Sequence, residues 1–128
     1  MIDMPGYFRM ARMESKKSDL KIQMGAAISR GGNLIAVGCN QNKSHPMVDT
    51  FHLHAEAAAI ISRRYNSDSL VNAVIWVYRE RANGMPTMAK PCKSCMRLIV
   101  AAGIKKVLYT ISKPPYYKEI NLRGGNSD

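Results

Sequence analysis

Two short stretches of this chain carry side chains that can do chemistry together. The first is His54-Ala55-Glu56, and the second is Pro91-Cys92-Lys93-Ser94-Cys95. One imidazole and two thiolates are ligands that zinc prefers, and three protein ligands leave a coordination position for water, as in catalytic zinc sites. Zinc lowers the pKa of that water to about 7, so hydroxide becomes available at neutral pH. The carboxylate of Glu56 is suited to proton transfer beside the metal.

Each stretch is followed by an apolar run that predicts a helix. The runs are residues 57–61 and residues 96–102, and Gly103 ends the second. Cys92 and Cys95 lie three residues apart, so they share one face of a helix. Both motifs are therefore expected at helix N-termini, where the helix dipole stabilises thiolates.

The pair His54 and Glu56 sets a condition on this geometry. Residues two apart point about 200° away from each other on a regular helix. The two side chains can therefore serve one site only if the tip of the helix, rather than its side, faces the metal.

Together the stretches match the pattern H-x-E…P-C-x-x-C, and the chain resembles the zinc-dependent cytidine and deoxycytidylate deaminase superfamily. Both halves stand in the family's order, and residues 57–90 leave room between them for a strand and a loop. The chain is most similar to the compact, viral-type deoxycytidylate deaminases. It departs from them at Ala58, where many carry an asparagine.

The resemblance implies hydrolytic deamination of a cytosine base to uracil, most of all the conversion of dCMP to dUMP. Zn²⁺ would be the cofactor, held by His54, Cys92 and Cys95. Glu56 would be the catalytic residue, taking a proton from the attacking water and delivering it to the ring and then to the leaving ammonia. A homo-oligomer is expected from the resemblance alone.

Five further residues are candidate substrate contacts. In the resembled family an asparagine at a strand end contacts the sugar, a backbone N–H of the His-Ala-Glu stretch binds the base, and an aromatic residue lies near the base. Asn40, Ala55 and Tyr109 occupy these positions. Capping of a turn by Asn40 and core packing of Tyr109 are the alternatives. Lys43 and Ser44 are candidate phosphate contacts by residue type alone.

Other interpretations of the motif remain open. A thioredoxin-like redox pair explains the Cys-x-x-C spacing but neither His54 nor Glu56. A structural zinc site needs a fourth protein ligand, which His52, His45 or Cys39 would supply. A chance pairing of cysteines on an ordinary core helix is the third interpretation, because buried cysteine is common.

The chain is strongly basic, with a net charge of +10 and a pI of about 9.8. Such a charge suits an anionic partner, either the phosphate of a nucleotide or a nucleic acid. A deaminase that acts on cytosine or adenine in RNA or single-stranded DNA is therefore the main alternative function. A free nucleoside or base as substrate, and a non-catalytic structural-zinc module, are further alternatives.

Residues 79–90 are predicted to form a loop that leads into the cysteine helix and lies over the metal. Arg79, Arg81 and Lys90 are candidate phosphate ligands in that loop. A solvated loop surface explains these charges equally well.

The length of 128 residues predicts a single domain, residues 1–128. Roughly the last five residues are expected to be disordered. No apolar run reaches the ~18 residues of a membrane span, and no signal peptide is visible. Two of the three cysteines are assigned to metal, and Cys39 is expected to be buried in a strand. This cysteine usage favours a reducing, cytoplasmic location.

The remaining elements are predicted from hydrophobic periodicity and turn residues. They are a helix at 5–16, a hairpin with strands at 21–30 and 34–39, a helix at 53–65, a strand at 72–78, the cysteine helix, a strand at 105–111 and a short helix near 115–121. Two strand-to-helix connections predict a mixed sheet with parallel neighbours and helices on both faces. The predicted fold class is α/β, a three-layer α-β-α sandwich with a mixed central sheet, which is also the cytidine deaminase-like fold that the resemblance implies.

Overall fold

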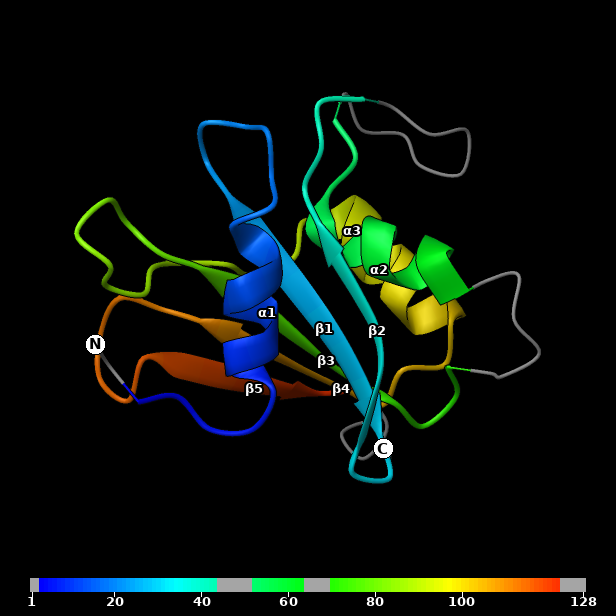
Figure 1. Ribbon diagram of the computed structural model, residues 1–128. Helices are drawn as coiled ribbons and strands as arrows, with labels where there is room; N and C mark the ends of the chain where they lie inside the picture. Colours follow the sequence, from blue (N-terminus) through cyan, green and yellow to red (C-terminus); the bar gives the residue numbers. More distant parts are fainter. Residues whose placement is uncertain (1–2, 44–51, 64–69, 123–128) are drawn as a thin grey trace.

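The computed structural model describes residues 3–43, 52–63 and 70–122. Its elements are α1 (Phe8–Ser15), β1 (Met24–Arg30), β2 (Asn33–Cys39), α2 (Ala55–Arg63), β3 (Val74–Arg79), α3 (Lys93–Ala101), β4 (Lys106–Thr110) and β5 (Tyr117–Asn121) (Figure 1). The strands form one sheet in the order β2-β1-β3-β4-β5. Strands β3 and β4 are parallel, and the other neighbouring pairs are antiparallel. This is the mixed sheet that the sequence predicts.

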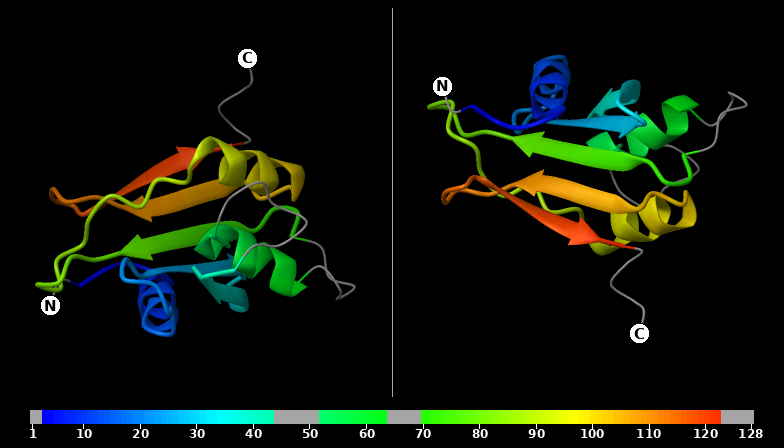
Figure 2. Two further views of the ribbon diagram at one scale, coloured as in Figure 1. Left: turned by 90° about the horizontal axis from the view of Figure 1, so that it is seen from above. Right: turned by 90° about the horizontal axis from the view of Figure 1, so that it is seen from below.

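The helices cover both faces of the sheet, as the alternation of side chains along the central strands shows. One row across β1, β3 and β4 consists of Ala27, Trp76 and Leu108. This row packs in a cluster with Phe8 and Ala11 of α1. The next row consists of Ile28, Ile75 and Val107, and it packs in a second cluster with residues of α2 and α3. The three-layer sandwich is therefore confirmed, with α1 on one face and the helices that follow the two motifs on the other (Figures 1 and 2).

Two glycines let the helices approach the sheet closely. A Cβ atom at Gly25 would lie 1.9 Å from the backbone oxygen of Ala11 in α1. A Cβ atom at Gly38 would lie 2.4 Å from the backbone nitrogen of Ala59 in α2. Neither distance is possible for real atoms, so glycine at these two positions sets how deeply α1 and α2 sit on the hairpin.

Strand β1 begins at Met24, so the prediction of a strand from Lys21 is wrong for residues 21–23. The side chain of Asn40 forms hydrogen bonds with the backbone here. Its Nδ2 donates to the Ile22 oxygen at 2.6 Å, and the Met24 N–H donates to its Oδ1 at 2.8 Å. The Ile22 side chain is 54% exposed and does not extend the apolar row of the strand. Residues 21–23 are therefore part of a connection between α1 and the sheet.

The C-terminal region forms a strand where the sequence predicts a short helix. Strand β5 pairs antiparallel with β4, with Ile120 opposite Val107. The pairing satisfies the backbone groups along what would otherwise be a free edge of β4. Ile120 and Leu122 also pack against the main core, so a short helix near 115–121 is ruled out by both backbone and side chains.

Three further predictions concern the C-terminus, membrane spans and Cys39. Roughly the last five residues are expected to be disordered, and they lie outside the described residues, which end at 122. In the described ranges, no helix combines the length and apolar character that a membrane crossing requires. Cys39 is 7% exposed at the end of β2, as predicted.

Candidate metal centre and adjoining pocket

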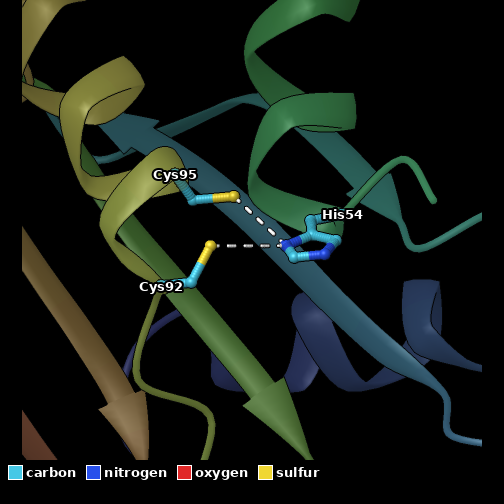
Figure 3. A group of neighbouring side chains, drawn as sticks. All are labelled: His54, Cys92 and Cys95. Carbon is cyan, nitrogen blue, oxygen red and sulfur yellow. Dashed lines mark hydrogen bonds between the residues drawn. The ribbon is translucent and has the colours of Figure 1, made fainter. Parts of the chain in front are cut away.

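The two motifs meet where α2 and α3 begin. His54 directly precedes α2, Cys92 is the N-cap residue of α3, and Cys95 lies in the first turn of that helix. The Nδ1 atom of His54 is 3.4 Å from Sγ of Cys95 and 3.7 Å from Sγ of Cys92 (Figure 3). The expected convergence at the N-terminal tips of two helices is therefore found.

These distances fit a tetrahedral zinc ion. With Zn–S near 2.3 Å and Zn–N near 2.0 Å, a tetrahedral angle puts nitrogen and sulfur about 3.5 Å apart. The two observed separations lie on either side of that value, and the three donor atoms are all within 4.8 Å of one another. His54 would thus bind through Nδ1, and one coordination position would stay free.

No fourth ligand completes the cluster within the described residues. Cys39 and His52 are described and are not members of it, whereas His45 lies outside the described residues. Structural zinc sites are almost always closed by four protein ligands. The three-membered cluster therefore favours a site that leaves room for a water molecule.

Burial shifts the pKa values of Cys95 and His54 in the cluster. Burial raises the pKa of the Cys95 thiol, and the charges of Glu56 and Cys92 raise it further, against the opposing effect of the Ala57 backbone N–H. A thioredoxin-like redox pair accounts only for the two cysteines, whereas Nδ1 of His54 lies within 3.7 Å of both Sγ atoms, as binding of one shared metal ion requires. Burial, with a smaller effect of His52, lowers the pKa of His54 and keeps its imidazole neutral, the form that binds metals.

Glu56 is the buried carboxylate of this site. It lies in the first turn of α2 and is 2% exposed. Burial raises its pKa to about 7, and its own backbone N–H opposes the shift only in part. A carboxyl group with such a pKa can both accept and release a proton near neutral pH.

A small pocket opens beside the metal centre. It has a volume of about 340 Å³ and is bordered by His54, His52, Asn40 and the segment that joins α1 to β1. The members of that segment in the pocket wall are Leu20, Lys21 and Ile22, and Met24, the first residue of β1, lies beside them. This volume is at the lower end of the range of about 300–1,000 Å³ for small-molecule sites, and a mostly apolar wall with few polar groups is typical of them.

Asn40 binds backbone and also borders the pocket. Its carboxamide holds the backbone at Ile22 and Met24 in place, and its side chain also lines the pocket beside His54. An amide group carries two N–H donors and two lone pairs on oxygen. One N–H and one lone pair therefore remain for a ligand.

The other predicted substrate contacts are placed differently. Ala55 is fully buried as the first residue of α2, where backbone N–H groups have no partner within the helix. Tyr109 is 6% exposed and belongs to the main core cluster, which matches the packing alternative, and it is not among the pocket-lining residues. Lys43 is exposed and does not line the pocket, and Ser44 lies outside the described residues.

The loop at residues 79–90 does not lie over the metal centre, so this prediction is wrong. In Figures 1 and 2 the loop after β3 extends away from α2 and α3. Its three cations are also separated, because Arg79 and Arg81 line one cavity while Lys90 borders a groove along α3. The cause is a small hairpin within the loop, in which Glu80 bridges to Pro86 and turns the chain outward.

Sequence reasoning missed the pocket wall formed by residues 20–24. The period-two pattern extends through Ile22 and Met24, so it predicts a strand and gives no sign of a pocket. The competing signal is Asn40, because an asparagine at a strand end often binds nearby backbone. That signal does not tell which backbone the side chain will bind.

Comparison with known proteins agrees with this geometry. The family described as "Cytidine and deoxycytidylate deaminase zinc-binding region" matches residues 3–111. The chain belongs to the cytidine and deoxycytidylate deaminase family, and its cofactor is zinc. No curated protein matches the chain significantly.

Solved structures of similar proteins include two deaminases. The apo dCMP deaminase of the cyanophage S-TIM5 is 26% identical with a TM-score of 0.65, over 84% of this chain and 82% of that one. Its complex with dCMP and dUMP is 24% identical with a TM-score of 0.64, over 82% and 78% of the two chains. The cytidine deaminase of Burkholderia pseudomallei is 19% identical with a TM-score of 0.71, over 93% and 94%, a likeness of fold.

Proposed function

We propose that this protein is a zinc-dependent hydrolase that deaminates a cytosine base, with dCMP as substrate and dUMP as product. The observation that carries the proposal is the convergence of one imidazole and two thiols at two helix tips, with buried Glu56 in the first turn of α2 and a small pocket beside them. Membership of the deaminase family supports the reaction. The choice of dCMP is supported by the similarity to the cyanophage enzyme.

His54, Cys92 and Cys95 would hold the zinc ion through Nδ1 and two Sγ atoms. When bound, zinc supplies Lewis-acid activation of a water molecule at neutral pH. The helix N-termini that carry these residues direct backbone N–H groups toward the thiolates and stabilise their negative charge.

Glu56 would move the protons of the reaction. It accepts a proton from the water that attacks C4 and passes it to the ring nitrogen N3. It then transfers the second proton of that water to the amino group, which leaves as ammonia, so that water and cytosine become uracil and ammonia. A buried carboxyl with a pKa near 7 is suited to receive and return a proton in each cycle.

Substrate binding would use groups around the pocket. We assign hydrogen bonding of the sugar to Asn40, which lines the pocket, and hydrogen bonding of the base to the backbone N–H of Ala55. Contact of Tyr109 with the base, and of Lys43 and Ser44 with a phosphate, stay predictions from the sequence.

The alternative functions find less support. The small pocket has no Phe, Tyr or Trp among its described lining residues, whereas proteins that bind single strands commonly stack bases on such side chains. A non-catalytic zinc module would be expected to close the metal site with a fourth ligand. Ala58, where the chain departs from the resembled enzymes, is 7% exposed and lies against Gly38 of β2.

The test is ammonia release by the zinc-loaded protein on a matched panel: deoxycytidine, cytidine, CMP, dCMP, dCTP, a cytosine-containing single strand and an adenosine-containing RNA stem-loop. We expect turnover of dCMP above all others. The Glu56→Ala variant should keep its zinc and lose turnover by about 10²–10⁴-fold, the usual contribution of general acid–base catalysis. Turnover of the nucleic acids alone would refute the mononucleotide assignment, and substantial activity of Glu56→Ala would refute the proton-transfer role.

We also propose that the chain acts as a single domain and as a homo-oligomer in a reducing, cytoplasmic environment. All three cysteines are unpaired thiols, which fits such an environment. Light scattering on the purified protein tests the association state.

A further inference from the structure

A second cavity adjoins the pocket beside the metal centre and has no part in the proton transfers described above. It has a volume of about 460 Å³ and lies between the C-terminal end of α1, residues 21–23 and the first residues after β3. Lys21 and Ile22 border both cavities. The second cavity, which we call the basic pocket, is therefore the immediate neighbour of the site that would hold the base.

The negative charge in the basic pocket is already compensated. Oε1 of Glu80 accepts hydrogen bonds from Nε of Arg12 at 2.9 Å and from the hydroxyl of Tyr78 at 2.6 Å, and Lys16 binds its other carboxylate oxygen. Partial burial raises the pKa of Glu80, but the three hydrogen bonds outweigh it, so the net shift is downward. Glu80 is thus ionised at neutral pH and fully partnered.

Three positive charges in the basic pocket have no such compensation. They belong to Lys21, Arg79 and Arg81. None of these side chains forms an ion pair or hydrogen bond within the part of the chain that the structure describes. A concave site with a surplus of lysine and arginine attracts anions, and guanidinium groups suit phosphate oxygens in particular.

The backbone groups of Arg79 and Arg81 form hydrogen bonds with neighbouring residues. The backbone N–H of Arg79 donates to the hydroxyl of Thr110 at 3.2 Å, and its carbonyl accepts the Thr87 N–H at 3.0 Å. The backbone of Arg81 closes the small hairpin through both its N–H, to Met85, and its carbonyl, from Gly84, each at 2.8 Å. Hydrogen bonds therefore fix the backbone of both arginines at the edge of the cavity that their side chains line.

We propose that the basic pocket binds the phosphate group of the nucleotide whose base lies beside Glu56. This inference rests on the proposed function and goes further, because it assigns the phosphate to Arg79, Arg81 and Lys21 and not to Lys90, which borders a different groove. A free nucleotide fits better than a nucleic acid strand. Neither cavity offers a Phe, Tyr or Trp among its described lining residues for the stacking of a flanking base.

The experiment compares two variants that remove the same charge. Arg79→Gln/Arg81→Gln alters the basic pocket, and Arg9→Gln/Lys105→Gln removes two exposed cations that border neither cavity. For the first variant, kcat/KM on dCMP should fall by roughly 10–100-fold, mostly through KM, since charge-assisted hydrogen bonds to phosphate are lost. Its kcat/KM on deoxycytidine, which lacks the phosphate, should stay within about twofold, and the control variant should leave both values unchanged.

Binding gives a second measurement that does not depend on turnover. Titration calorimetry with dUMP and with deoxyuridine should show weaker binding of dUMP alone in Arg79→Gln/Arg81→Gln. Thermal unfolding checks that this variant is folded, and the single variant Arg81→Gln, which changes only an exposed side chain, repeats the test with less perturbation.

The outcomes separate the two proposals. Equal losses on dCMP and deoxycytidine, or a loss no larger than in the control variant, would overturn the basic pocket as a phosphate site while leaving deamination in place. A loss confined to single-stranded oligonucleotides would also overturn it, in favour of a nucleic acid path. If the wild type deaminates nothing in the panel, the proposed function fails, and selective loss of dUMP binding would still support the phosphate site.

Discussion

The carboxylates of Glu56 and Glu80 are both largely hidden from solvent, but their surroundings are opposite. Glu56 is 2% exposed, and within the described residues it has no ion pair. Burial raises its pKa to about 7. The side chain of Glu80 is 13% exposed and has three donors around it, and its pKa is lowered.

This difference separates a charge used for chemistry from one used for structure. The bonds of Glu80 join α1, through Arg12 and Lys16, to the end of β3. Glu56 has no ion pair with any residue that the structure describes, and it lies in the first turn of α2, two residues after His54 of the candidate metal centre. Among the described residues, the carboxylate that has to exchange protons therefore has no cationic partner, whereas the carboxylate that joins α1 to β3 is paired with two cations.

The largest expected effect is a difference in deaminase activity between variants of Glu56 and Glu80. Glu56→Gln should lower turnover by about 10²–10⁴-fold, because the amide cannot transfer the protons. Its stability should be unchanged or higher, because an unpaired buried carboxylate is costly. Glu80→Gln should keep most of its activity on deoxycytidine. Ammonia release, zinc content and thermal unfolding measure all three properties, and equal activity losses in the two variants would erase the distinction.

The second-largest expected effect is the loss of zinc, and of the stability that zinc provides, when a metal ligand is removed. Cys95→Ala should lose zinc, and a chelator should lower the unfolding temperature of the wild type while leaving that of Cys95→Ala unchanged. Cys39→Ala is the matched control, because Cys39 is also buried but lies outside the metal cluster. This control should keep its zinc and its response to the chelator. A chelator response in Cys95→Ala equal to that of the wild type would show that zinc binds elsewhere.

The metal centre could be predicted from the sequence because its chemistry is local. His54 and Glu56 are two residues apart, and Cys92 and Cys95 are three apart, so each pair is brought to a helix tip by the adjacent helix alone. Only the meeting of the two tips requires the fold. Strands β2 and β3 are both antiparallel to β1 and so run in the same direction, and the helices that follow them, α2 and α3, therefore begin at the same edge of the sheet.

The pocket wall could not be predicted, because a long-range interaction decides it. Residues 21–23 continue the alternation of apolar and polar residues along β1, and this local pattern predicts a strand. The carboxamide of Asn40, which follows the second strand of the hairpin, forms hydrogen bonds with the backbone at Ile22 and Met24 instead. The apolar side chain of Ile22 is then left at the rim of two cavities. Strand β5 is a similar case, since its conformation depends on the free edge of β4.

A smaller expected effect concerns the contribution of Glu80 to the stability of the fold. Glu80→Gln should lower the free energy of unfolding by about 1–3 kcal/mol, because Arg12 and Lys16 lose the charge that they bind. Glu119→Gln removes a carboxylate that is 46% exposed and 3.4 Å from Lys106, and it should cost at most about 0.5 kcal/mol. Denaturant unfolding at neutral pH measures both. Similar losses in the two variants would show that the bonds of Glu80 contribute no more than a surface ion pair.

The smallest effect is a pH dependence that follows from the sign of the Glu80 shift. Its pKa is lower in the folded protein than the ordinary value of 4.5, so the folded state binds a proton at Glu80 less readily than the unfolded state. The stability that Glu80 contributes is therefore fully present above pH 4.5 and is lost as the pH falls through the lowered folded value. The difference in unfolding free energy between the wild type and Glu80→Gln should be constant from pH 7 to about pH 5 and should shrink below 4.5. A difference that persists at lower pH would mean that Glu80 stabilises the junction of α1 and β3 through its shape and not through its charge.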